Sequence, residues 1–403
     1  MLNTRDKCHN FVFKRKGFFM FKRLSHHDTC SAVVPKVSII VPCFNVAQYI
    51  KACLNCLTAQ TMQDIEIICI DDCSTDDTLE KIHEYARASH DKRIKIIKMQ
   101  QNAGVAAARN AGMNAATGEY IGFVDPDDTI DINFFEQLYE CATKDKSDIA
   151  KGITTVIDTD DTCQVWNNNK RVCENKFNFN LCFWSAIYNH NFLKKHNLQF
   201  PVGILISEDT VFLIKSVFFA NKVATTDTVS YHYIRREGSA DSAFLSPRKV
   251  KSGLDALHEL MTWLNNQPDM TENAYACILK RICEIINYMT EKNVSPSDKK
   301  LICETFMWIY KNTKNKRVML SEYRKRIRHA LTNDDIKMLH RCIFTRNTRY
   351  RLFGFFPLLK ISELPEQEKR FQLLYFIPIL TIRWRSHKIR IYSFGLPLLT
   401  IKH

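Results

Sequence analysis

The sequence predicts an α/β fold, with a mostly parallel sheet that carries helices on both faces. Four short apolar segments rich in β-branched residues, at 37–41, 65–70, 94–99 and 120–124, have the composition of buried strands. The segments between them show the apolar spacing of amphipathic helices. Strands that alternate with helices pair in parallel, because each helix returns the chain to the same edge of the sheet.

Polar residues follow each predicted strand, at the edge where ligands gather in sheets of this kind. They are Pro42 and Asn45 after the first strand, Asp71 and Asp72 after the second, Asn102 and Gly104 after the third, and Asp125, Asp127 and Asp128 after the fourth. Four separate strand ends therefore deliver polar groups to one rim, which predicts a binding site there.

The carboxylates in EYIGFVDPDDTI, residues 119–130, are crowded enough to need a positive partner. Three acids beside an apolar strand repel one another and lose hydration. A divalent cation fits best, because Mg²⁺ and Mn²⁺ prefer oxygen ligands and leave positions open for phosphate. The alternative is an Asp-rich turn that caps the following helix.

Arg109 is the only strong charge between Lys98 and Glu119, in a segment of small residues that would pack closely on the sheet. A single large cation there predicts an anionic partner, either a ligand phosphate or one of the acidic loops. A structural salt bridge to Asp72 is the alternative.

The charge of this 403-residue chain, +14 overall, is concentrated at its two ends. The ends, 1–34 and 341–403, carry +5 and +9, and the middle is neutral. This distribution argues against a nucleic-acid partner and favours an anionic membrane surface. Fifteen cysteines without regular spacing indicate free thiols in a reducing compartment. With no apolar run of 18 residues, we expect a cytoplasmic protein, peripherally associated with the inner face of the cell membrane.

Four parts are expected along the chain: a basic extension at 1–34, the α/β domain at 35–242, a helical region at 243–340 and a basic hydrophobic segment at 341–403. The helical region would cover the acceptor side or make an interaction surface. The last segment repeats an apolar pattern around Pro357, Pro378 and Pro397, which suggests small stacked units. These units would dock on a membrane, or alternatively form a homo-oligomer.

Four blocks together resemble the nucleotide-sugar-binding half of family 2 glycosyltransferases of the GT-A fold, the type that builds bacterial surface polysaccharide and lipopolysaccharide. They are KVSIIVPCFNVAQYIKACLNCLTAQT, IEIICIDDCSTDDT, NAGVAAARNAG and YIGFVDPDDTI. The resemblance is strong over 36–130 and weaker to about 242. It implies that Asp125 and Asp127 form a DxD pair holding Mn²⁺ or Mg²⁺, with Asp127 the direct ligand and Asp125 nearer the donor ribose or sugar.

The resemblance also implies where the other rim residues meet the donor. Asp71 and Asp72 would contact the uridine, Arg109 would lie near the base or diphosphate, and Pro42 and Asn45 would belong to the first loop. Phe44 stands where a tyrosine is common in the family, which keeps the ring for stacking but removes a hydroxyl.

The segment SED, 207–209, resembles the acidic motif that supplies the catalytic base, which would be Asp209. From the residues alone, Ser207 is a plausible N-cap, and the helix dipole would favour the anionic form of Asp209. An acidic first turn that only complements the dipole is the alternative. His232 is a weaker candidate for contact with the metal or diphosphate, with a structural strand histidine as the alternative, and Arg235 and Arg236 could meet phosphate oxygens.

The expected function is therefore that of an inverting glycosyltransferase. It would move a sugar from a nucleotide-diphosphate sugar, expected to be a UDP-sugar, to a hydroxyl of a glycan or lipid-linked saccharide. Two other functions remain open: a nucleotide-sugar-binding partner without turnover, and a nucleotidyltransferase. The latter would need a Gly-rich loop with a basic residue after the first strand, whereas the chain has PCFNVAQ.

Overall fold

The computed structural model describes residues 34–344 except 181, 237–244 and 269, together with the backbone of the strands between 347 and 402. All four predicted strands are present, with helices between them. In chain order the elements are β1 Val37–Cys43, α1 Ile50–Thr58, β2 Ile65–Asp71, α2 Thr78–Ser89, β3 Ile94–Lys98, α3 Val105–Ala115 and β4 Tyr120–Phe123. The apolar segments form strands because β-branched side chains pack well on both faces of a buried sheet.

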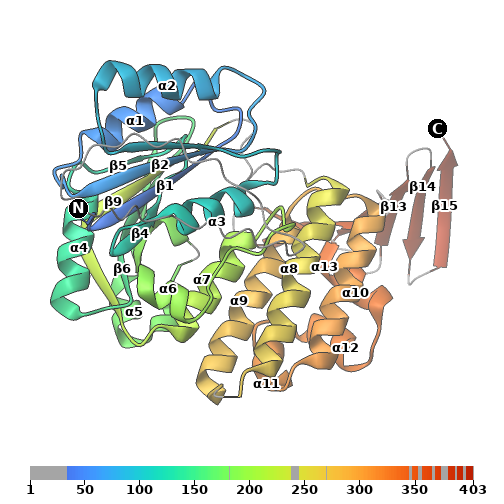
Figure 1. The fold of residues 1–403 in the computed structure, drawn as a ribbon. Coiled ribbons are helices and arrows are strands. Elements are labelled where there is room, and N and C mark those ends of the chain that lie inside the picture. Colours follow the sequence, from blue (N-terminus) through green and yellow to red (C-terminus); the bar gives the residue numbers. More distant parts are fainter. Residues whose placement is uncertain are drawn as a thin grey trace, which may run out of the picture. The chain divides into compact units, whose positions relative to one another are not determined.

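These strands form the parallel half of one larger sheet, in the order β3-β2-β1-β4 (Figure 1). The order continues through β8-β6-β9-β5, with β7 paired to β6. In this second half β4 pairs antiparallel with β8, and β6 pairs parallel with β9. The α/β fold class is confirmed, and the parallel character belongs mainly to the first half.

The elements of the second half lie between residues 129 and 234. They are β5 Thr129–Ile130, α4 Phe134–Asp145, β6 Ile149–Ile157, β7 Cys163–Trp166, α5 Asn169–Glu174, η1 Lys176–Asn178, η2 Phe183–Ser185, β8 Ala186–Asn189, α6 His190–Lys195, α7 Glu208–Phe219 and β9 Val223–Ile234. The long strand β9 returns beside β5, so it places its last residues next to the turn that follows β4.

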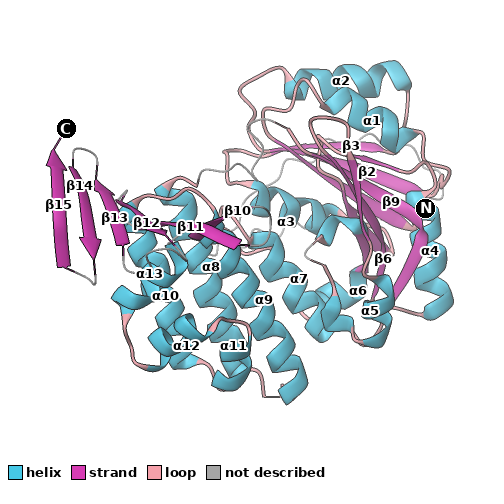
Figure 2. Ribbon diagram, turned by 180° about the vertical axis from the view of Figure 1, so that it is seen from behind, coloured by secondary structure: helices cyan, strands magenta, loops and turns pink. Residues whose placement is uncertain are grey.

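Helices cover both faces of the sheet, as predicted: α1 and α2 lie on one face, and α3 and α7 on the other (Figures 1 and 2). The helix α3 approaches β1 closely at Gly112, where a Cβ atom would lie 2.5 Å from Cγ2 of Ile40. Only a residue without a side chain fits there, because a larger one would push the helix off the strand. This close packing fixes the position of Arg109, one turn earlier in the helix.

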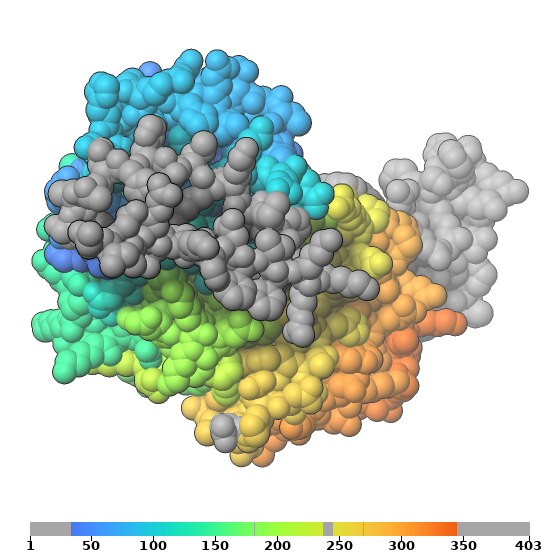
Figure 3. Space-filling view, viewed as in Figure 1, coloured from blue at the N-terminus to red at the C-terminus, as the bar shows by residue number. Residues whose placement is uncertain are grey.

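Residues 247–344 form helices that share a second hydrophobic core, which confirms the helical character predicted for this region. The helices are α8 Pro247–Asn266, α9 Glu272–Glu291, α10 Pro296–Asn312, α11 Lys316–Ser321, α12 Lys325–Thr332 and α13 Ile336–Phe344. The N-caps of the first three helices are Ser246, Thr271 and Ser295, whose hydroxyls each accept a hydrogen bond from a backbone N–H of the first turn. Their surface is yellow to orange in Figure 3.

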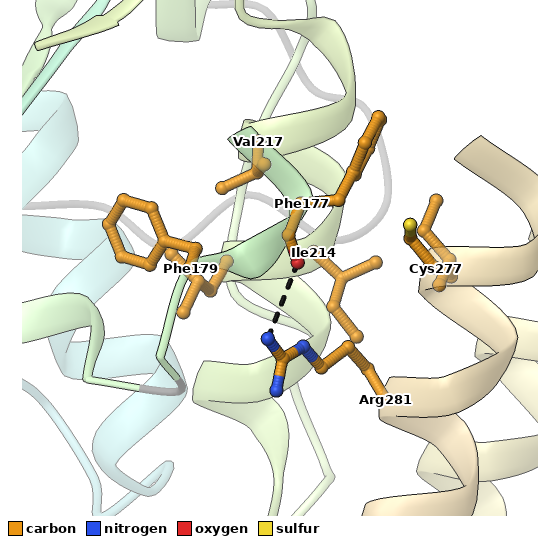
Figure 4. Close-up of a pocket in the computed structure, with 8 residues that line it drawn as sticks. Phe177, Phe179, Ile214, Val217, Cys277 and Arg281 are labelled. Carbon is orange, nitrogen blue, oxygen red and sulfur yellow. Dashed lines mark hydrogen bonds between the residues drawn. The ribbon is translucent and has the colours of Figure 1, made fainter. Parts of the chain in front are cut away.

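The helical region contacts the α/β domain along α7 and η1. Lys215 Nζ lies 2.6 Å from a carboxylate oxygen of Glu259, and Arg281 donates to the carbonyl of Phe177 at 3.4 Å. Between η1, α7 and α9 lies a small apolar hollow of about 20 Å³ (Figure 4). It has room for about one water molecule, and none of the predicted site residues lines it.

The last strands form an antiparallel sheet in the order β10-β11-β12-β13-β14-β15. They span Asn347–Leu352, Phe356–Leu364, Glu368–Leu373, Leu380–Arg385, Lys388–Ser393 and Leu396–Lys402. Each sequence repeat corresponds to one antiparallel pair, β10 with β11, β12 with β13, and β14 with β15. Pro357 and Pro397 lie on strands, whereas Pro378 lies outside the described residues.

Two further expectations concern cysteines and membrane spans. All the cysteines that the structure describes are free thiols, as their irregular spacing predicted. Among the described helices, none is both long and apolar enough to cross a membrane.

Candidate active site

The predicted site residues gather at the rim formed by the carboxyl ends of the parallel strands. Asp71 ends β2, Asp72 follows it, and the acidic turn follows β4. The helix α7 contributes its first turn, Glu208 and Asp209, from a part of the chain about 80 residues later. Parallel pairing of β1 with both β2 and β4 brings these strand ends together.

Arg109 joins the acidic turn to the first turn of α7. Its Nη2 donates to Oδ1 of Asp125 at 3.0 Å, and its Nη1 donates to Oε1 of Glu208 at 3.0 Å. The guanidinium also lies over the rings of Phe183 and Phe200, at 4.6 and 5.3 Å from their centroids. Burial lowers the pKa of Arg109, but the two carboxylates outweigh it and raise the pKa above its ordinary value. The group therefore stays charged.

Asp72, the alternative partner for Arg109, is hydrogen-bonded to backbone N–H groups instead. The predicted salt bridge between Arg109 and Asp72 was therefore wrong. The Oδ1 atom of Asp72 accepts the N–H of Ala103 and its Oδ2 accepts the N–H of Gly104, both at 2.8 Å. Gly104 has a φ of +87°, a conformation that favours glycine. Asp72 thus holds the loop that leads into α3.

Asp71 is fully buried and only partly satisfied. Its Oδ1 accepts the N–H of Ser74 at 3.3 Å, whereas its Oδ2 has no hydrogen-bond partner within the described part of the chain. Leaving a buried carboxylate oxygen without a donor is costly. The arrangement suits a ligand that brings an N–H or O–H group to this oxygen.

The first loop is tied to the loop after β2 through Asn45. The Oδ1 atom of Asn45 accepts the N–H of Thr75 at 2.8 Å and its hydroxyl at 3.2 Å, and Asn45 itself has a φ of +53°. Pro42 lies within β1 opposite Ile70. Phe44 is 46% exposed, so its ring is available for stacking.

The third acid of the turn, Asp128, is an anchor. It is 3% exposed and accepts hydrogen bonds from the Tyr231 hydroxyl at 2.8 Å and the Ile234 N–H at 2.9 Å. Burial, reinforced by Asp125, raises the pKa of Asp128 to about 8. The Tyr231 hydroxyl also accepts the N–H of Asp125 at 3.1 Å, so β9 fixes the turn. Sequence reasoning missed Tyr231, because no local pattern pairs it with a turn about 100 residues earlier.

The other two acids are accessible from solvent. The side chains of Asp125 and Asp127 are 25% and 44% exposed. Burial and the charge of Asp125 raise the pKa of Asp127, while Arg236 opposes the rise from a distance of 3.0 Å. In the described residues no third His, Cys, Asp or Glu completes a cluster with them. Two exposed carboxylates fit Mg²⁺ or Mn²⁺, which commonly take their remaining ligands from phosphate and water.

His232 has partners other than those expected of a metal or diphosphate contact. Its Nε2 lies 3.0 Å from Oδ1 of Asp131, and its Nδ1 lies 3.5 Å from the Thr129 hydroxyl. These contacts connect β9 to β5 and the residue after it, which is the structural role weighed as the alternative.

Asp209 lies in the first turn of α7, as predicted, but Ser207 does not cap the helix with its side chain and has a φ of +66°. The N–H of Thr210 donates to Oδ1 of Asp209 at 2.6 Å. Burial and the charge of Glu208 nevertheless raise the pKa of Asp209 to about 7, against the opposing effect of Arg109. The net shift of this pKa is therefore upward, set mainly by burial rather than by the helix N-terminus.

Glu208 is the site residue that sequence reasoning left without a role. It is 7% exposed, and its carboxylate pairs with Arg109. The signal was present in the chain: a lone arginine in an alanine-rich helix needs an anion, and SED offers two adjacent candidates. In the structure the anionic partners of Arg109 are Asp125 of the acidic turn and Glu208 of the first turn of α7.

Replacing Arg109 by Met should lower the free energy of unfolding by about 3–5 kcal/mol, because the buried Glu208 and the partly exposed Asp125 both lose their counter-charge. Denaturant titration measures this. Adding Glu208→Gln to Arg109→Met should recover part of the loss, since one uncompensated charge disappears. An Arg109→Met protein within 1 kcal/mol of the wild type, by the same order of estimate, would contradict the bridge.

Comparison with known proteins shows what the α/β domain is similar to. Residues 38–208 match the model of glycosyl transferase family 2. The putative glycosyltransferase EpsH of Bacillus subtilis is 35% identical over 215 residues, which are 49% of this chain and 60% of that protein. The poly(ribitol-phosphate) beta-glucosyltransferase of Bacillus spizizenii is 30% identical over 55% of this chain and 36% of that protein. The chain thus spans between about a third and three fifths of these relatives.

A solved structure extends the likeness of the fold beyond the matched domain. The crystal structure of residues 1–349 of Staphylococcus aureus TarS in complex with UDP-GlcNAc aligns with a TM-score of 0.62 and 22% identity, covering 76% of this chain and 89% of that one. The GT-A fold expected from the four sequence blocks is confirmed. Residues 38–208 are therefore similar to glycosyl transferase family 2.

Proposed function

We propose that the chain is an inverting glycosyltransferase that moves a sugar from a UDP-sugar to a hydroxyl of a glycan or lipid-linked saccharide. The observation that carries this proposal is the bridge from Asp125 through Arg109 to Glu208, the residue that precedes Asp209 in the first turn of α7. A transfer by single displacement needs a group that holds the donor diphosphate and a base near the sugar. The bridge couples the two candidates for these roles.

The proposed uridine contacts rest on the rim after β1 and β2. The Oδ2 atom of Asp71, buried and without a partner in the described residues, suits a donor N–H of a base. The exposed ring of Phe44 offers a stacking surface beside it in the first loop. The S. aureus TarS structure contains UDP-GlcNAc, which supports a uridine nucleotide as the donor class.

Asp127 and Asp125 are the proposed holders of Mn²⁺ or Mg²⁺. When bound, the divalent ion would offset the negative charge that develops on the departing diphosphate. Within the chain itself, Asp125 is already oriented by Arg109 and by the Tyr231 hydroxyl. The turn therefore needs no reorganisation of Asp125 before a donor arrives.

Asp209 is the proposed base that takes the proton from the acceptor hydroxyl. Its pKa of about 7 is close to physiological pH, where a base combines substantial ionisation with real proton affinity. Arg109 limits the rise of that pKa, so the carboxylate is ionised in a large share of the molecules at neutral pH.

Asp209→Asn should lower turnover about 10²- to 10⁴-fold while leaving donor affinity nearly unchanged, because a base acts mainly in the chemical step. Release of UDP in the presence of an acceptor gives turnover, and calorimetric titration gives donor affinity. The matched control is Asp255→Asn, the same change at an exposed residue of α8. Near wild-type turnover in the Asp209 variant would refute the assignment.

The pH dependence of kcat/KM should show an acid limb centred near pH 7, with about a tenfold fall per pH unit below it, because protonated Asp209 cannot accept a proton. Glu208→Gln should move this limb to lower pH, since the charge of Glu208 raises the pKa of Asp209. An upward shift, or an identical limb in the variant, would contradict the proposed coupling.

The product distinguishes the proposed activity from the other two functions. A glycosyltransferase releases UDP, a nucleotidyltransferase releases pyrophosphate, and a binding partner without turnover releases neither. The presence of both the DxD pair and Asp209 favours turnover. A panel of UDP-sugars would identify the transferred sugar, which depends on the loops around the rim.

We propose that the segment 341–403 docks the enzyme on the anionic inner face of the cell membrane, where a lipid-linked acceptor would be presented. The support is its net charge of +9 and its repeated apolar pattern. Side chains of this segment lie outside the described part of the structure, so the proposal rests on sequence. Homo-oligomer formation through the same segment is the competing explanation.

The full chain should float with vesicles containing phosphatidylserine and remain at the bottom with neutral vesicles, because the segment is strongly basic. Deletion of 341–403 should abolish flotation. Light scattering on both proteins provides the other readout: a full chain that fails to float but loses an oligomeric state on deletion would favour self-association.

A further inference from the structure

Asp127, the proposed metal ligand, forms an ion pair with an arginine in the structure. Nη2 of Arg236 lies 3.0 Å from Oδ2 of Asp127 and also donates to the backbone carbonyl of the same residue. Arg236 lies just beyond the end of β9, whose last residue is Ile234, while Asp127 belongs to the turn after β4. The contact therefore joins two strand ends through one guanidinium.

A second contact also holds the guanidinium of Arg236. Its central carbon lies 3.8 Å from the centroid of the Tyr49 ring, in the segment that precedes α1. The side chain of Arg236 is only 19% exposed as a result. An arginine stacked on an aromatic ring and paired with a carboxylate is well placed, because both contacts are electrostatically favourable.

The two arginines of the rim differ in how firmly they hold their acids. Arg109 is 6% exposed in its side chain and pairs with two carboxylates, so it is a fixed part of the fold. Arg236 pairs with one carboxylate whose side chain is 44% exposed. Ion pairs with such exposure are weak, and water or another cation can replace one partner at small cost.

On the basis of the proposed function, we propose that Arg236 is a positioning residue that competes with the divalent cation for Asp127. In the donor-free protein it neutralises Asp127 and keeps this carboxylate in place. A divalent cation and a guanidinium repel each other, so Arg236 on Oδ2 disfavours a cation at either oxygen of Asp127. Cation binding to Asp127 therefore competes with the Arg236 ion pair, which lowers the affinity of the donor-free site for the cation.

The experiment measures Mn²⁺ binding to the full chain without nucleotide, by the loss of the free Mn²⁺ signal in electron paramagnetic resonance. Arg236→Ala should bind Mn²⁺ about two- to fivefold more tightly than the wild type, the effect expected for removing a weak competing ion pair. Asp127→Ala in the same titration should lose this binding, which assigns the signal to the site.

Arg235→Ala is the matched control, because it removes one positive charge from the neighbouring residue. Arg235 pairs with Asp158 at 3.1 Å rather than with the acidic turn. Its Mn²⁺ affinity should equal that of the wild type. If Arg235→Ala tightens binding as much as Arg236→Ala does, the effect is one of general charge and the competition is overturned.

Variants of Tyr49 test whether the position of Arg236, and not only its charge, affects Mn²⁺ binding. Tyr49→Leu removes the ring but keeps the arginine, and should tighten Mn²⁺ binding by a smaller factor than Arg236→Ala. Tyr49→Phe keeps the ring and should match the wild type. Equal affinity in the wild type and Arg236→Ala would overturn the inference while leaving the proposed function intact, whereas no Mn²⁺ binding by any protein would overturn the metal assignment itself.

Discussion

The rest of the site depends on the two ion pairs that the buried guanidinium of Arg109 makes. Arg109 lies on α3, which Gly112 allows to pack tightly on β1, and its two terminal nitrogens donate to one carboxylate in the acidic turn and one in the first turn of α7. A buried arginine is costly unless its charge is paired and its N–H groups are used. Asp125 and Glu208 pair the charge and accept hydrogen bonds from the two terminal nitrogens, whereas Nε has no hydrogen-bond partner in the described part of the chain. Neither the acidic turn nor the start of α7 can therefore move away without leaving charge uncompensated.

The crowding of acids after β4 is resolved differently at each residue. Asp125 pairs with Arg109, Asp127 pairs with Arg236, and Asp128 is buried with two hydrogen-bond donors and a raised pKa. The turn is thus stable without a bound cation. The same division explains function: the acid that serves as an anchor is inaccessible, whereas the two proposed ligands remain partly exposed.

The sequence predicted those features that local patterns determine. The four parallel strands, the helices between them and the gathering of polar residues at one rim follow from apolar periodicity and from the geometry of parallel sheets. The partners of Arg109 and His232 did not follow, because these contacts join residues far apart in the chain. Arg109 pairs with Glu208 at the start of α7, and His232 pairs with Asp131. The spacing of these residues in the sequence carries no information about their pairing.

The pKa of Asp209 shows why a correct local argument can give the wrong sign. A helix N-terminus stabilises an anion by about 0.3–1 kcal/mol, and one pKa unit corresponds to about 1.4 kcal/mol, so the dipole alone lowers a pKa by less than one unit. Burial and the adjacent charge of Glu208 act in the opposite direction and raise it to about 7. Burial and the charge of Glu208 therefore outweigh the helix dipole. The ion pair with Arg109 holds the carboxylate of Glu208 in place. The ion pair between Arg109 and Glu208 therefore also keeps in place the acid that raises the pKa of Asp209, the proposed base.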